Sequence, residues 1–179
     1  WIGMSLLIRG ASLVGIGEWE NGLSDIAEGM RAHSAMEAVT YQPLALSILA
    51  KGLIEGGRFD EALGAVDQAL ALIAKTGERF YLAELLRLKG EVHARKGALP
   101  EAESWLREAI ELARRQEAKL FELRSAVSLC RLLDQAGRER AVRETLEPVY
   151  KWFEEGLDAP DVVEANAVIF PGAVERIGN

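Results

Sequence analysis

The chain has 179 residues, of which 49% are hydrophobic, and this is enough for one domain or one short array of repeats. Its formal net charge of -7, with no run of Lys or Arg, would repel a phosphate backbone, so nucleic acid is not expected as a direct partner. The single cysteine, Cys130, cannot form an internal disulfide, which fits the reducing environment of the cytoplasm.

The N-terminal stretch from Trp1 to Gly17 is apolar, but it does not have the features of a membrane or targeting segment. It contains Arg9, is too short to span a bilayer and lacks a basic leader. We therefore expect a buried helix here and no membrane association. Because the chain starts with Trp1 rather than methionine, we also expect it to be part of a longer polypeptide.

A pattern that recurs every 40 residues organises the chain. Glycines at 17, 57, 97 and 137 are each followed by a stretch that aligns without gaps: GEWENGLSDIAEGM, GRFDEALGAVDQAL, GALPEAESWLREAI and GRERAVRETLEPVY. Within these stretches, apolar residues recur at the spacing of an amphipathic helix. Each glycine therefore marks a turn between two helices, where a positive φ angle ends the first helix at little cost.

Small residues predict where the two helices of each pair cross. We call the helix before each loop glycine the leading helix and the helix after it the trailing helix. The leading helices have Gly10, Ala50, Gly90 and Cys130 at equivalent positions, and the trailing helices have Gly22, Ala62, Ala102 and Val142, then Gly29, Ala69, Ala109 and Val149. Small side chains at these positions would let two backbones approach closely.

The resulting prediction is an all-α solenoid of four helical hairpins, forming a single domain over residues 1–179. The repeats are expected at about 1–38, 39–78, 79–118 and 119–157. Leading helices are predicted near 4–16, 42–56, 80–96 and 120–136, and trailing helices near 19–33, 59–75, 99–117 and 139–155. Pro148 should bend the last trailing helix. A final helix near 160–172, after Asp158 and Pro160, would cap the open end of the stack.

The spacing of a small residue, a loop glycine, an aromatic and further small residues, clearest in GRFDEAL at 57–63, resembles the tetratricopeptide repeat. This resemblance implies a right-handed superhelical solenoid that binds protein or peptide partners. The chain departs from the pattern at Leu99 and Glu139, which stand at the aromatic position, and its 40-residue period is longer than the usual length of about 34.

Residues 80–169, from YLAELLRLKGEVHARKG to EPVYKWFEEGLDAPDVVEA, also resemble the C-terminal repeat region of large bacterial signalling proteins. In those proteins a nucleotide-cyclase domain or a DNA-binding regulator domain precedes a P-loop ATPase module. The resemblance implies a regulatory segment in signal transduction, with upstream domains of the same polypeptide as partners.

The sequence contains no recognisable catalytic, cofactor or metal site. GASLVGIG at 10–17 lacks the lysine that a phosphate-binding loop needs. His33, His93 and Cys130 are too few and too dispersed for a metal site or a nucleophilic centre, and Cys130 is expected to be a buried packing residue. We therefore expect no enzyme activity, and an autonomous hydrolase is the least favoured of the functional hypotheses.

Leading helices would line the concave side of such a stack, so their outward stripes are the candidate binding surface. In the third and fourth repeats the stripe is charged, with spacings of three and four that place each set on one face. Arginines there would suit carboxylates or phosphorylated ligands, although a merely solvated face is the alternative. The candidates are Glu84, Arg87, Glu91, Arg95, Arg124, Arg131 and Asp134.

The corresponding stripe in the first two repeats is apolar and would be unfavourable in water. We expect it to pack against upstream polypeptide or against a second copy of the chain, which would make a homo-oligomer. Its residues are Met4, Leu7, Val14, Leu44 and Ile54. The sequence favours two functional hypotheses. One is a non-catalytic interaction scaffold, and the other is a regulatory segment that controls an attached cyclase, ATPase or transcription-regulator module.

Overall fold

The computed structural model describes residues 2–34 and 41–171, and within these ranges it contains helices and no strand. The predicted boundary between the first two repeats, at 38 and 39, lies outside the described residues. The helices, in chain order, are α1 (Ile2–Gly15), α2 (Trp19–Ser34), α3 (Gln42–Glu55), α4 (Phe59–Thr76), α5 (Leu82–Arg95), α6 (Leu99–Arg115), α7 (Lys119–Gln135), α8 (Glu139–Tyr150) and α9 (Pro160–Ile169). The all-α solenoid predicted from the repeat is confirmed.

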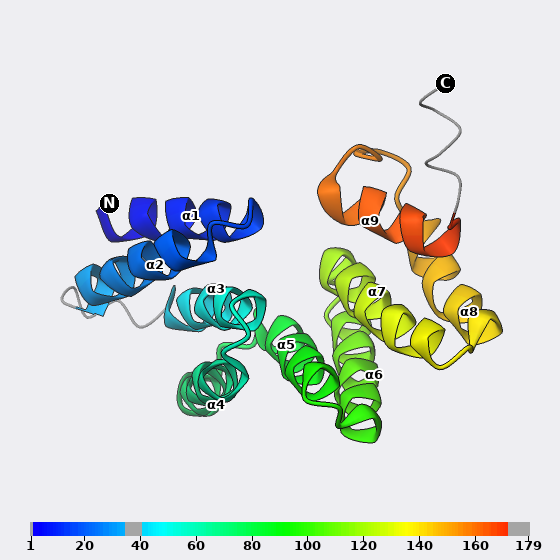
Figure 1. Ribbon diagram of the computed structural model, residues 1–179, viewed down its shortest axis with the longest axis horizontal. Coiled ribbons are helices and arrows are strands. Elements are labelled where there is room, and N and C mark those ends of the chain that lie inside the picture. The colour runs from blue at the N-terminus through cyan, green and yellow to red at the C-terminus, as the bar shows by residue number, and fades with distance from the viewer. Residues whose placement is uncertain (1, 35–40, 172–179) are drawn as a thin grey trace.

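The helices form successive antiparallel hairpins that follow an open arc from α1 to α9 (Figure 1). Each leading helix packs against its own trailing helix, and each trailing helix contacts the next leading helix. Leading helices also contact one another along the array, α1 with α3, α3 with α5, and α5 with α7. The leading helices therefore make one continuous wall.

The small residues predicted at the helix crossings are buried in every hairpin. Gly10 and Gly22 show why they must be small: a Cβ atom added to Gly10 would lie 2.7 Å from the carbonyl oxygen of Gly22, and one added to Gly22 would lie 2.7 Å from that of Gly10. Ala62 and Ala102, at the position of Gly22, have no exposed surface. In the first hairpin the seam between the two helices is thus set by backbone contact.

The loop glycines that set the 40-residue period adopt the left-handed conformation, with φ of 88° at Gly17, 72° at Gly57, 80° at Gly97 and 68° at Gly137. A residue with a Cβ atom is strained at such angles. Each glycine therefore lets the leading helix stop and the trailing helix start within a few residues.

The last trailing helix is shorter than predicted, because α8 ends at Tyr150 rather than near 155. Pro148, inside α8, has no backbone N–H, so the carbonyl of Glu144 loses the hydrogen bond that a helix would normally provide there. The chain continues as tight turns, in which the amide of Trp152 donates to the carbonyl of Val149 and that of Phe153 to that of Tyr150. The helix thus continues through Pro148 and ends two residues after it, and the predicted bend stays a prediction.

The final helix, α9, covers the end of the stack as predicted, although it ends at Ile169 rather than near 172, a position outside the described residues. It packs on α7 and α8, and it buries Val162, Ala165 and Ile169 in the same core as Leu129 and Leu146. Because α9 contacts α7 as α7 contacts α5, it extends the wall of leading helices by one member.

We predict that Gly22→Ala lowers the free energy of unfolding by about 1–3 kcal/mol, because the new methyl group overlaps the carbonyl of Gly10 and forces the helices apart. Urea unfolding followed by circular dichroism measures the change. The matched control is Gly64→Ala, also inside a helix but with nothing within 4 Å of its Cβ position. Its better helix propensity should raise stability by about 0.5–1 kcal/mol. Equal effects at the two sites would contradict the backbone-contact seam.

Candidate functional site

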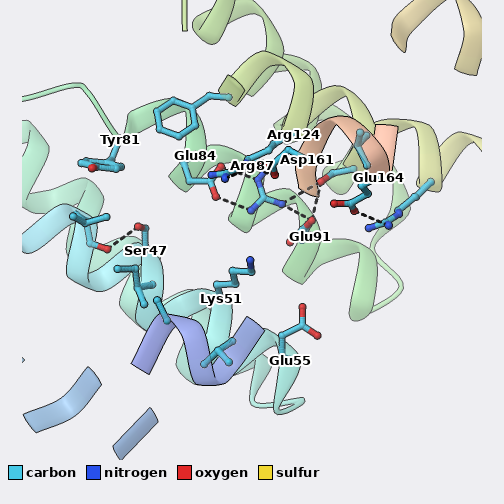
Figure 2. A pocket seen from close by; sticks show the side chains of 18 residues that line it. Ser47, Lys51, Glu55, Tyr81, Glu84, Arg87, Glu91, Arg124, Asp161 and Glu164 are labelled. Carbon is cyan, nitrogen blue, oxygen red and sulfur yellow. Dashed lines mark hydrogen bonds and ion pairs between the residues drawn. The ribbon is translucent and has the colours of Figure 1, made fainter. Parts of the chain in front are cut away.

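A cavity of about 380 Å³ opens on the concave side of the array. Its lining comes from α1, α3, α5, α7 and α9, helices that are far apart in the sequence but adjacent in the wall (Figure 2). Four basic side chains line it, namely Lys51, Arg87, Arg124 and Arg131, together with five acidic ones, namely Glu55, Glu84, Glu91, Asp161 and Glu164. The cavity is therefore highly charged but nearly balanced.

The structure brings five of the seven predicted charged residues into this cavity: Glu84, Arg87, Glu91, Arg124 and Arg131. Arg95 and Asp134 do not line it and are exposed near the C-terminal ends of α5 and α7. A binding role for these two residues stays a prediction, beside the alternative of a solvated helix face.

Arg87 is the centre of a buried ion cluster on α5. Its guanidinium donates two hydrogen bonds to Glu84, with Nε 2.9 Å from Oε2 and Nη2 2.7 Å from Oε1, while Nη1 lies 2.5 Å from Oε1 of Glu91. Ser128 of α7 joins the cluster: its hydroxyl accepts from Nη1 at 3.2 Å and donates to Glu91 at 2.7 Å. The cluster therefore links α5 to α7.

Burial and charge act in opposite directions in this cluster. Burial alone would raise the pKa of Glu84, but the charge and hydrogen bonds of Arg87 outweigh it and hold the pKa of Glu84 below its ordinary value. Burial likewise opposes the charged form of Arg87, and Glu84 and Glu91 outweigh that effect and raise the pKa of Arg87. Glu84 and Arg87 are therefore both charged at neutral pH. Arg87 already donates to Glu84, Glu91 and Ser128, and its predicted role in ligand binding stays a prediction.

The two cavity arginines of α7 are also paired, in this case with α9. Arg124 makes a two-pronged contact with Asp161, at 2.7 and 2.8 Å, and Nη2 of Arg131 lies 2.6 Å from Oε1 of Glu164. Neither Asp161 nor Glu164 was among the predicted site residues. The 40-residue register could have identified Glu164 as a residue of the wall. It stands 40 residues after Arg124 and 80 after Glu84, on the same face of the next helix in the wall.

Lys51 is the one basic side chain of the lining for which no ion pair forms among the described residues. It projects from α3 into the cavity towards the Arg87 cluster (Figure 2). Burial opposes the charged form of Asp161, but the hydrogen bonds and charge of Arg124 outweigh it and lower the pKa of Asp161, with a smaller contribution from the charge of Lys51. An anionic group entering the cavity would therefore find its available cation at Lys51.

One side of the cavity is apolar and includes Leu44, Ile48, Tyr81 and Phe121. The ring centroids of Tyr81 and Phe121 are 6.1 Å apart, and the exposed ring of Phe80 lies 5.9 Å from that of Phe121. The aromatic pair was not predicted, but positions 81 and 121 are again 40 residues apart and belong to the repeat register.

The predicted apolar docking face is wrong in part, because Leu7, Val14 and Ile54 are core residues with 0%, 6% and 2% exposure. Leu7 and Val14 pack with Ile26 of α2, and Met4 lies half-buried beside them. A leading helix contacts both its own trailing helix and the next leading helix, so these apolar positions face neighbours within the chain. Leu44 is half-buried and lines the cavity together with Val14.

Neither Cys130 nor His93, which were considered for catalysis or metal binding, lines the cavity. Cys130 is fully buried and its thiol lies 3.4 Å from the carbonyl of Val142, His93 is half-buried on α5, and the side chain of His33 is outside the described part. In the described part of the chain, no three His, Cys, Asp or Glu residues gather in a way that could hold a metal ion. Nor does any helix described there have the length and apolarity to cross a membrane.

Removing Arg87 should destabilise the fold strongly. We predict that Arg87→Met lowers the free energy of unfolding by about 3–5 kcal/mol, because it leaves the buried carboxylate of Glu84 without its partner. The control is Arg95→Met on the same helix, which is exposed and should change stability by less than about 0.5 kcal/mol. Urea unfolding at pH 7 compares the two, and similar losses would contradict the role of the buried cluster.

Cys130 should be unreactive in the folded protein. Burial raises the pKa of Cys130 to about 12, with a smaller contribution from Asp134, so the nucleophilic thiolate is scarce at pH 8. We expect a disulfide exchange reagent such as Ellman's reagent to label Cys130 only after unfolding in guanidinium. Fast stoichiometric labelling of the native protein would contradict this account.

Residues 41–115, which comprise α3 to α6, match the tetratricopeptide repeat family. No curated protein matches the chain. The helical pairing, the buried small residues and the loop glycines extend the same architecture over the described residues on both sides of the match. The chain thus forms a solenoid of tetratricopeptide-like helical hairpins, with the family match itself carried by residues 41–115.

Proposed function

We propose that the chain is a non-catalytic scaffold for protein interaction, and that its concave cavity binds an extended peptide segment of a partner or of a neighbouring domain. Repeats of the family that residues 41–115 match generally mediate contacts between proteins. The observation that carries the proposal is the cavity itself, because five helices of the wall contribute side chains to it. At about 380 Å³ it has the size of a ligand site and is far too small for a folded domain.

The lining supports a peptide of defined chemistry. The aromatic and aliphatic side, with Tyr81, Phe121 and Ile48, suits one large apolar side chain, and Lys51 suits a carboxylate nearby. Arg87, Arg124 and Arg131 act differently: as members of ion pairs they fix the shape of the wall. Specificity would then come from the apolar side and from a single available cation.

A second candidate function is control of an attached nucleotide-cyclase, ATPase or transcription-regulator module. It is supported by the sequence resemblance of residues 80–169 to bacterial signalling proteins. The same cavity could serve it, with a segment of the attached module as the bound peptide. A cytoplasmic location, as proposed from the sequence, accords with the single, buried thiol.

Selection of a displayed library of random 12-residue peptides on the purified chain tests the scaffold proposal. We expect selected peptides to combine an apolar or aromatic residue with an acidic one, and Lys51→Ala to weaken their binding about tenfold or more through loss of one charged hydrogen bond. Fluorescence anisotropy with a labelled selected peptide gives the dissociation constants.

Lys75→Ala is the matched control, since Lys75 is an exposed lysine of α4 that does not line the cavity. It should leave the affinity unchanged. If no peptide is enriched, or if the enriched peptides bind the Lys51→Ala and Lys75→Ala proteins equally well, the cavity is not the binding site.

A further inference from the structure

The outer face of α1 is exposed at positions that are buried in the other leading helices. Position 5 of α1 corresponds in the 40-residue register to Ala45, Leu85 and Ser125, whose exposures are 2%, 0% and 0%. Position 12 corresponds to Gly52, Val92 and Leu132, which are likewise buried. Ser5 and Ser12 themselves are exposed.

In the later repeats these positions face the preceding hairpin. A Cβ atom on Gly52 of α3 would lie 3.0 Å from the side chain of Leu23 of α2, and Ser128 of α7 hydrogen-bonds to Arg87 of α5. The register equivalent of Ser128 on α1 is Ile8. The face of α1 that contains Ser5, Ile8 and Ser12 is therefore the face that every following leading helix uses to stack on the hairpin before it.

The composition of this face suits burial better than solvent. Ile2, Ile8 and Ile16 are 76%, 60% and 73% exposed, and α1 contains no acidic residue and one basic residue, Arg9. A terminal helix that caps a repeat array in water normally has a polar outer face. The serines do not prevent close packing, because Ser125 at the same register position as Ser5 is completely buried.

Arg9 indicates the charge of the helix that would cover this face. Its register equivalent is Lys89 of α5, whose Nζ lies 2.9 Å from Asp67 on the preceding trailing helix, α4, and 4.8 Å from the ring of Trp105 on its own trailing helix. Like Lys89, Arg9 contacts its own trailing helix. It pairs with Asp25 of α2, which stands at the register position of Trp105. A contact like that of Lys89 with Asp67 would require an acid on a trailing helix that precedes α1.

We propose that the outer face of α1 is a docking surface for a further helical hairpin of the same repeat kind. The trailing helix of that hairpin would pack on α1 as α4 packs on α5, with an acid opposite Arg9. Apolar residues of the same hairpin would pack against Ile8 and Ile16. This inference rests on the repeat register and does not depend on what the concave cavity binds.

A register-matched fusion tests the proposal. A second copy of residues 41–80, placed directly before residue 1, puts the copied α4 where a preceding trailing helix would lie, with its Asp67 facing Arg9. We expect amide hydrogen exchange of α1, measured on peptic fragments of residues 2–15, to slow at least tenfold relative to the native chain. Because the copied segment does not contain the α1 sequence, the α1 fragments are unambiguous.

Two exposed positions supply the comparison. Ile8→Glu in the fusion should restore the fast exchange of α1, whereas Val163→Glu, at a 50% exposed position on α9, should leave it slow. Unchanged exchange in the fusion, or slow exchange that survives Ile8→Glu, would overturn the proposal. Sedimentation of the native chain adds a further check: a dimer that Ile8→Glu dissociates would show that a second copy occupies this face, and would also overturn it.

Discussion

Close approach of the two helices at the crossing of each hairpin, where small residues are buried, is the constraint on which the rest of the structure depends. At Gly10 and Gly22 the backbones of α1 and α2 leave no room for even a methyl group. Alanine stands at the position of Gly22 in the trailing helices that pack on α3 and α5. This contact fixes how each trailing helix lies on its leading helix. Because it recurs every 40 residues, each leading helix presents the same register positions to the concave side.

The concave wall follows from that repetition, and its charges stabilise it from within. Arg87 ties α5 to α7 through Ser128, while Arg124 and Arg131 tie α7 to α9 through Asp161 and Glu164. The Arg87–Glu84 pair is buried, so its formation costs desolvation energy, whereas the Arg131–Glu164 pair is exposed and contributes little to stability. The pairs link neighbouring helices of the wall, and in the proposed function Lys51 and the aromatic side recognise the ligand.

Much of this architecture could be predicted from the sequence, because small residues, loop glycines and amphipathic spacing act locally. The end of α8 could not be placed, because the residues KWFEE that follow Tyr150 include no glycine or proline that would mark a helix end. Partners of the arginines depend on which helices lie side by side, so Arg87 resembled a ligand-binding residue until Glu84 and Glu91 were seen to enclose it. Leu7 and Ile54 were misplaced because a leading helix has several buried faces.

Proton–proton distances across the helix crossings test the central claim most directly. In a nuclear Overhauser experiment on the isotope-labelled chain, the account predicts cross-peaks between the α-protons of Gly10 and Gly22. It also predicts cross-peaks between the α-protons of Gly90 and protons of Ala102, whose carbonyl oxygen lies 3.3 Å from the Cβ position of Gly90. Absence of these cross-peaks in a folded, well-dispersed spectrum would show that the hairpins do not share the buried seam, and would contradict the account.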